Sequence, residues 1–290
     1  MDRMRVRTDL ALEARESFDG SDTEVHGVVV EEEYEEALDL KITRVKILSE
    51  RGTREMGKPV GTYLTMEAPG MAVPDEDYHR EISEALAGCL KELTGENRDR
   101  SVLVAGLGNR DVTPDALGPK TVSNLMITRH LFREYGKETM GMEQASAVSG
   151  IAPGVMAQTG METSEILQGI IDQTSPDILL VIDALAARST RRLGRTIQLT
   201  DTGIQPGSGV GNHRGSLTKE SLGIPVIAIG VPTVVEAAAI IYDAQGSCER
   251  MPPHLNGMFV TPKNIDEIIK QLSFTLSEAL NIVFQVSGKA

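Results

Sequence analysis

Apolar and polar residues follow two different patterns along the chain, and the change comes near residue 101. The first part contains β-rich segments separated by an acidic turn region, which is typical of a hairpin-like sheet with exposed charged faces. This part also contains one segment, 75–93, whose apolar residues recur at helical spacing. The first 20 residues are polar and unpatterned, so we expect them to be loosely held. These patterns predict a β-rich elaboration over residues 24–67, with strands at 25–33, 40–48 and 61–67.

From residue 101 onward the pattern is one of strands alternating with helices. Two of these strands, near 178–182 and 226–229, are almost continuously apolar, which is typical of a sheet covered on both faces. The predicted fold is therefore a three-layer α/β/α domain with a mostly parallel central sheet, whose core spans residues 101–290. Strands are expected at 102–106, 144–149, 178–183, 196–200 and 226–230, and helices at 118–135, 163–174, 233–241 and 264–284.

Length and charge narrow the class of protein. A chain of 290 residues can bury a full hydrophobic core. Its 42 acidic and 29 basic residues give a net charge of −13, which disfavours direct nucleic-acid binding. No apolar run approaches the roughly 18 residues of a membrane helix, and no secretion signal is recognisable, so we expect a cytoplasmic protein. Cys89 and Cys248 match no metal or redox spacing and are expected to be free thiols.

Acidic residues follow two of the predicted strands. Asp111 and Asp115 lie in the loop after 102–106, and Asp183 ends the strand that starts at residue 178. Because chemistry in α/β proteins gathers at the carboxyl ends of strands, this pattern predicts a two-carboxylate hydrolase site. One ionised carboxylate would take a proton from water while the other, protonated, donates one; which is which stays open.

Each acid also has a purely structural interpretation. Asp115 precedes a predicted helix and has the residue type of an N-cap. Asp183 could be a buried carboxylate held by backbone amides or by Arg188. Asp111, beside Arg110, is interpreted as a solvated charge.

A glycine-rich loop over residues 203–215 is a second candidate feature. Its backbone could form a substrate cradle or an oxyanion site, or it could be an ordinary flexible loop. The candidate residues are Gly207, Ser208, Gly209, Gly211 and His213.

Other chemistries find less support in the sequence. Gly106 and Gly108 lack the third glycine of a dinucleotide fingerprint, and no phosphate-binding GxxxxGK[ST] motif occurs. No GxSxG motif occurs, Ser189 and Ser208 have no evident base, and Cys89 lies in a helical pattern. His130 is expected to be packed or hydrogen-bonded. Asp115, Asp183 and His213 could bind a divalent metal, although no HExxH motif supports this, and no cofactor is expected.

Long blocks of the sequence resemble a known family. The matching blocks are residues 7–11, 112–119, 127–132, 153–156, 182–189, 203–212, 224–233 and 260–262. On these blocks the chain is similar to the germination protease family of spore-forming bacteria, which degrades the small acid-soluble proteins that coat spore DNA. The similarity departs after Ile241, where the family carries a longer insertion and this chain has a short linker over residues 243–256.

The resemblance implies an activity and a mode of activation. It implies that Asp115 and Asp183 are the catalytic pair, and that substrates are cut after an acid in a Thr-Glu-(Ile or Phe)-Ala motif. The segment Thr8-Asp9-Leu10-Ala11 resembles this motif. It therefore implies a zymogen that cuts itself between Asp9 and Leu10, which leaves a peptidase domain of residues 10–290 after loss of the propeptide 1–9.

The resemblance also implies the setting of the reaction. The enzyme would be a homo-oligomer, most simply a tetramer, in the cytoplasm of the spore core, with a fold similar to that of the hydrogenase-maturation peptidases. Two alternatives remain open at this point. One is a metal-dependent maturation-type peptidase, and the other is a non-catalytic binding protein on an α/β scaffold.

Overall fold

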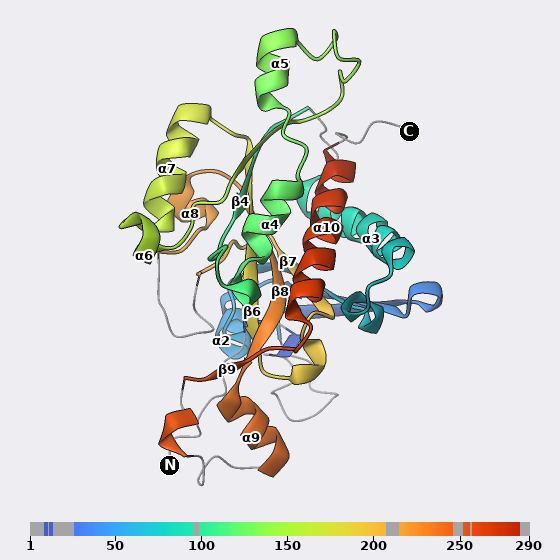
Figure 1. The fold of residues 1–290 in the computed structure, drawn as a ribbon, viewed down its shortest axis with the longest axis vertical. Coiled ribbons are helices and arrows are strands. Elements are labelled where there is room, and N and C mark those ends of the chain that lie inside the picture. Colours follow the sequence, from blue (N-terminus) through green and yellow to red (C-terminus); the bar gives the residue numbers. More distant parts are fainter. Residues whose placement is uncertain are drawn as a thin grey trace.

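The computed structural model describes residues 9–10, 12–13, 26–95, 99–206, 215–245, 252–255 and 257–284. Its centre is one mixed sheet, in which the strands follow the order β1-β2-β3-β7-β8-β6-β4-β5 and β9 pairs with β8 (Figure 1). The strands are β1 (Val28–Glu35), β2 (Leu40–Ile47), β3 (Gly61–Glu67), β4 (Ser101–Gly106), β5 (Ala147–Ile151), β6 (Ile178–Ala187), β7 (Thr196–Thr200), β8 (Val226–Glu236) and β9 (Phe259–Val260).

The sheet has a parallel part and an antiparallel part. Strands β5, β4, β6 and β8 run parallel to one another, whereas β7 and the N-terminal strands β1 to β3 extend the same sheet in antiparallel fashion. The predicted β-rich elaboration is therefore the antiparallel continuation of the parallel core. The charged residues of β1 are exposed at the edge of the sheet, as predicted for this segment.

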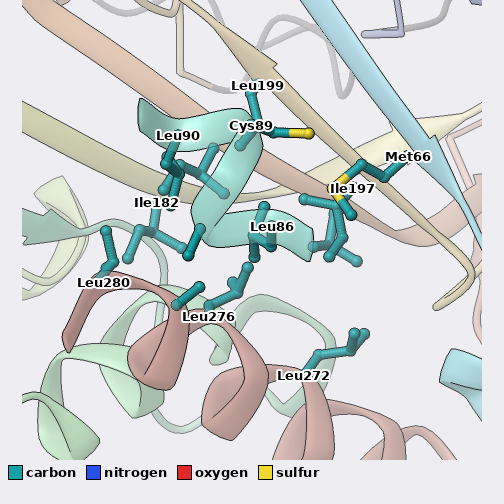
Figure 2. Packing of buried hydrophobic residues seen from close by; sticks show 14 of the residues in the cluster. Met66, Leu86, Cys89, Leu90, Ile182, Ile197, Leu199, Leu272, Leu276 and Leu280 are labelled. Carbon is teal, nitrogen blue, oxygen red and sulfur yellow. The ribbon is translucent and has the colours of Figure 1, made fainter. Parts of the chain in front are cut away.

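One face of the sheet is covered by α3 (Glu76–Thr94), α4 (Leu117–Asn124) and α10 (Ile265–Val283). The α3 helix begins where Asp75 accepts a hydrogen bond from the backbone of Tyr78, and its apolar side packs on α10 and on the sheet. Figure 2 shows Leu86 and Leu90 of α3 between Leu276 and Leu280 of α10 and the sheet residues. Each fully buried leucine of this kind contributes about 2 kcal/mol to stability.

The opposite face is covered by α7 (Thr163–Thr174) and α8 (Lys219–Leu222), which lie across the sheet from α3 and α10 in Figure 1. Strand β4 shows the division: Val102 and Val104 belong to the α3 side, and Leu103 and Ala105 to the α7 side. The predicted three-layer α/β/α architecture is thus confirmed. The remaining helices are α2 (Glu50–Met56), α5 (Arg129–Tyr135), α6 (Met156–Thr159) and α9 (Ala237–Gln245), with short 3-10 turns at Glu36–Leu38, Pro69–Ala72, Thr113–Asp115 (η3), Thr190–Arg192 (η4) and Pro253–Leu255.

Several predicted boundaries were wrong. The single helix expected over 118–135 is two helices, α4 and α5, because the residues between them bond elsewhere: Thr128 donates to the carbonyl of Ser146 and accepts from the amide of Val148. The helix expected from residue 233 begins at Ala237, since β8 continues to Glu236 beside β6 and β9. The α2 helix was not predicted, although Ser49 caps its start and Gly57 ends it in the left-handed conformation.

The N-terminal segment was also predicted wrongly where it is described. It was expected to be loosely held, but Leu10 and Leu12 are buried, with 0% and 4% exposed, and Glu13 is 2% exposed. Leu10 packs with Leu185 of β6 and Val235 of β8. A short piece of chain near the N-terminus is therefore part of the core on the α7 side of the sheet.

Candidate active site

Asp183 lies in β6 directly after Ile182, the last residue of that strand to pair with β4. Only 8% of Asp183 is exposed, and its Oδ1 accepts a 3.0 Å hydrogen bond from the amide of Ala184. Side chains alternate along a strand, and Val181 packs on the α7 side, so Asp183 points to that side as well. The strand thus presents a nearly buried carboxylate directly beyond its last pairing with β4. Its parallel pairing with β8 continues to Ala187, so the predicted end of this strand at residue 183 was wrong.

Asp115 lies in the loop that follows β4, the strand next to β6. The loop starts against β6, because the amide of Leu107 donates a 2.8 Å hydrogen bond to the carbonyl of Ile182. Asp115 ends the 3-10 turn η3 (Thr113–Asp115), and its Oδ2 accepts a 2.7 Å hydrogen bond from the amide of Asn109. It is not the N-cap of α4: that position is Ala116, and no side chain caps the helix. The structural interpretation of Asp115 as a cap was therefore wrong.

Two glycines hold this loop against its neighbours. A Cβ on Gly118, in the first turn of α4, would lie 2.4 Å from the carbonyl oxygen of Leu107 and 2.6 Å from that of Ile182. A Cβ on Gly108, which has a φ of +107°, would lie 2.0 Å from the carbonyl oxygen of Asp115. The absence of both side chains allows the loop to pack closely, and η3 contacts both β6 and β8. The two predicted acids are therefore carried by adjoining elements: Asp115 by the loop after β4, and Asp183 by β6 just beyond its last pairing with β4.

The third acid of the loop faces solvent. Asp111 is exposed, and the side-chain amide of Gln158 lies 3.1 Å from Asn109 Oδ1 and 3.5 Å from Asp111 Oδ2. Arg110 donates to the hydroxyl of Ser123 at 2.8 Å. This agrees with the interpretation of Asp111 as a solvated charge.

The glycine-rich candidates Gly207, Ser208, Gly209, Gly211 and His213 lie outside the described residues. The structure describes the two ends of their segment. Ile204 and Leu217 form an antiparallel bridge, with reciprocal hydrogen bonds of 3.0 and 2.8 Å. The two ends of the segment therefore lie side by side, next to the buried cluster that contains Leu217 and Leu167.

Other nucleophile candidates occupy structural positions. Cys89 is 2% exposed in α3, and burial raises the pKa of its thiol to about 11, so the thiol stays protonated. Ser189 caps the 3-10 turn η4 by accepting from the amide of Arg191. His130 is exposed on α5, so the expectation that it would be packed was wrong. In the part of the chain that the structure describes, no group of three or more His, Cys, Asp or Glu residues could hold a metal ion.

The predicted cleavage site lies along the end of β6. The amide of Asp9 donates to the carbonyl of Ala186 at 3.2 Å, and its Oδ2 accepts from the amide of Ala186 at 3.0 Å. Leu10, which follows, is fully buried against Leu185. Asp9 and Leu10 therefore lie against the strand that carries Asp183. Asp9 contacts this strand at Ala186, three residues after Asp183.

Three residues near this segment were not identified from the sequence. Glu13 accepts hydrogen bonds from the amides of Arg188 and Ser189 at 2.8 and 3.1 Å, and Arg192 lies 3.5 Å from it. Lys58 and Gln198 donate to the carbonyl oxygen of Asp9. Nothing in the local sequence sets Lys58 apart from a surface lysine in a turn, and Gln198 has the strand pattern of a sheet residue.

Comparison with known proteins places the chain among bacterial peptidases. A family model described as germination protease matches residues 6–248. The germination protease of Caldanaerobacter subterraneus subsp. tengcongensis is 47% identical over 97% of this chain and 94% of its own length, and that of Clostridium perfringens is 42% identical over 97% and 95%. Among solved structures, the NiFe hydrogenase maturation protease HycI of Thermococcus kodakarensis KOD1 aligns over 68% of this chain and 99% of its own, with 19% identity and a TM-score of 0.38. None of the helices in the described segments is long and apolar enough to span a membrane.

Proposed function

The chain belongs to the germination protease family, and on that premise we propose that it is a sequence-specific endoprotease with Asp115 and Asp183 as its catalytic pair. The observation that carries the proposal is that the two acids belong to adjoining elements: Asp115 to the loop after β4, and Asp183 to β6 just beyond its last pairing with β4, where the amide of Leu107 bonds to the carbonyl of Ile182. Both acids could therefore act on one peptide bound at the carboxyl end of β4, beside β6.

The proposed chemistry is hydrolysis by water without a covalent enzyme intermediate. One carboxylate, ionised, takes a proton from water as the water oxygen adds to the peptide carbonyl carbon. The other, protonated, gives its proton to the leaving amine. Two carboxyl groups that share a site favour one shared proton, because the second negative charge is disfavoured by the first. The assignment of base and acid within the pair is left open.

The proposed substrates are the small acid-soluble proteins that coat spore DNA, cut after a glutamate in a Thr-Glu-(Ile or Phe)-Ala motif. This follows from the family and not from the fold. The proposal includes the setting that the family resemblance implies, a homotetramer in the cytoplasm of the spore core. A net charge of −13 agrees with an enzyme that reaches the coat proteins without binding the DNA itself.

We further propose that the protein is made as a zymogen and removes residues 1–9 by cutting between Asp9 and Leu10. The supporting observation is that this segment already lies against β6, through the hydrogen bonds of the Asp9 amide and carboxylate with the backbone of Ala186.

The deciding experiment is cleavage of a synthetic peptide that contains Thr-Glu-Ile-Ala by protein lacking residues 1–9. The same protein carrying Asp183→Asn is the matched control, and each is assayed with and without a strong chelator. Cutting after the glutamate that survives the chelator and disappears in the variant is the expected result. Cutting that the chelator abolishes would favour a metal-dependent maturation-type peptidase, and absence of cutting would favour a non-catalytic binding protein.

A further inference from the structure

The carbonyl oxygen of Asp9 accepts two side-chain hydrogen bonds. Nζ of Lys58 donates at 2.9 Å and Nε2 of Gln198 at 3.4 Å. This carbonyl belongs to the peptide bond between Asp9 and Leu10. In amide hydrolysis the carbonyl oxygen is the atom on which negative charge develops, and donors aimed at it lower the barrier.

We propose that Lys58 and Gln198 form the carbonyl-binding site of this peptidase. They donate to and polarise the carbonyl of the residue before the cut: Asp9 during self-cleavage, and afterwards the acidic residue of a protein substrate. The inference rests on the proposed cut between Asp9 and Leu10, and it adds to the two aspartates a pair of donors that they cannot supply themselves.

Lys58 has the chemistry of a charge stabiliser. It is half-buried in the turn between α2 and β3, and it directs its ammonium group at a neutral carbonyl oxygen. When water adds to the carbonyl carbon of residue 9, the oxygen becomes an oxyanion beside this cation. The bond to the amide nitrogen of Leu10 then breaks, and the proton for that nitrogen comes from the protonated aspartate. Lys58 neither gains nor loses a proton in either step.

Gln198 connects this site to Asp183 through the sheet. Gln198 of β7 and Asp183 of β6 both pair with Gly230 of β8, from its two sides. Residues aligned across neighbouring strands point to the same face, so the side chains of Gln198 and Asp183 both lie on the α7 side. Two strand spacings separate their backbones, a distance of about 10 Å. Gly230 leaves room between them, and the side chain of Leu185 occupies that space, 2.3 Å from where a Cβ would be.

Leu185 is also part of the pocket that receives the residue after the cut. Leu10 is fully buried in a cluster with Leu185, Ala187, Leu193 and Val235. The peptide bond between residues 9 and 10 is thus flanked by the carbonyl donors on one side and by an apolar pocket, two residues beyond Asp183, on the other. An aliphatic or aromatic side chain after the cut fits such a pocket.

The acid before the cut has its own contact. Oδ2 of Asp9 accepts from the amide of Ala186 at 3.0 Å. Burial lowers the pKa of the Lys58 ammonium group, and the charges of Asp9 and Glu13 oppose this by favouring the cation. A carboxylate at this position therefore meets a backbone donor and a nearby cation. A neutral side chain of the same length would lose the attraction between the charge of Asp9 and the ammonium group of Lys58.

The test measures release of residues 1–9 from the full-length chain by mass spectrometry. The variants are Lys58→Met, Lys58→Arg, Asp183→Asn and, as a matched control, Lys46→Met, which removes an exposed lysine that pairs with Glu31 on the outer strands. Docking of the segment is measured separately, by hydrogen exchange of residues 9–13 in chains that cannot cut: Asp183→Asn alone and Asp183→Asn with Lys58→Met.

We expect Lys58→Met to lower the rate constant of release by about 100-fold or more, as loss of an oxyanion donor does. Lys58→Arg keeps the charge and should cut faster than Lys58→Met, and Lys46→Met should cut at the wild-type rate. Hydrogen exchange of residues 9–13 should be the same with and without Lys58.

Two results would overturn the inference. In the first, Lys58→Met cuts at the wild-type rate. In the second, it loses cutting together with the exchange protection of residues 9–13, which would make Lys58 only an anchor. Failure of the proposed function can be distinguished from failure of this inference. If the proposed function is wrong, the wild-type chain does not cut after Asp9, or Asp183→Asn cuts as fast as the wild type.

Discussion

The amide of Asn109 donates a 2.7 Å hydrogen bond to Oδ2 of Asp115, so the loop after β4 closes around the acid that it carries. An asparagine at position 115 offers a carbonyl oxygen that can accept the same bond. We therefore expect Asp115→Asn to keep the free energy of unfolding within about 1 kcal/mol of wild type and to slow self-cleavage by at least about 100-fold. Urea unfolding and mass spectrometry of the N-terminus measure the two quantities.

The control for this variant lies in the same loop. Asp111 is exposed, and Asp111→Asn should change neither stability nor the rate of self-cleavage. Self-cleavage by Asp115→Asn at the wild-type rate would remove Asp115 from the proposed pair.

Gly118 lies where a side chain would disturb the packing of the loop. A Cβ there would meet backbone atoms of Leu107 and Ile182 at 2.4 to 2.6 Å, and backbone cannot rotate away as a side chain can. We expect Gly118→Ala to destabilise the chain by about 3 kcal/mol in urea unfolding. Gly88→Ala, at an exposed position inside α3 with nothing within 4 Å of its Cβ, should instead stabilise by up to about 1 kcal/mol. A Gly118→Ala chain as stable as wild type would mean that the loop can shift freely.

The parallel core could be predicted because its strands are signalled locally. Residues 178–182 form an unbroken apolar run, and such a run is required when both faces of a strand are covered. The end of the same strand could not be predicted. Residues 184–187 are mostly alanine, which does not favour strands, and they are extended because β8 pairs with them.

The candidate site also has a part that could be predicted from the sequence and a part that could not. Asp115 and Asp183 could be identified because each follows a recognisable apolar run, 102–105 and 178–182. Lys58, Gln198 and Glu13 could not, because their roles depend on contacts between segments far apart in the chain: Gln198 and the carbonyl of Asp9 are separated by 189 positions. No local pattern carries that information, and the N-terminal segment was expected to be loose for the same reason.

Glu13 anchors the part of the chain that remains after the proposed cut. It is 2% exposed and accepts from the amides of Arg188 and Ser189, while Arg192 lies 3.5 Å away. Glu13→Gln places an amide NH₂ opposite backbone donors and leaves the arginine without that charge. We expect a loss of about 1 to 3 kcal/mol in urea unfolding of the Asp183→Asn chain, together with faster hydrogen exchange of residues 9–13. Glu31→Gln, on the exposed strand β1, should change stability by less than about 0.5 kcal/mol. Equal effects of the two substitutions would contradict an anchoring role.

His79 makes stability depend on pH. It is fully buried between α3 and α10, where Nδ1 lies 2.7 Å from Oγ1 of Thr275, and burial lowers the pKa of its imidazole below the usual 6.5. Below about pH 6.5 the unfolded chain therefore binds a proton that the folded chain does not, so stability falls as the pH falls. Urea unfolding at several pH values between about 7.5 and 5.5 should show this slope in the wild type and in His130→Gln, whose imidazole is exposed. His79→Gln should flatten the slope, and an unchanged slope in that variant would mean that other groups cause it.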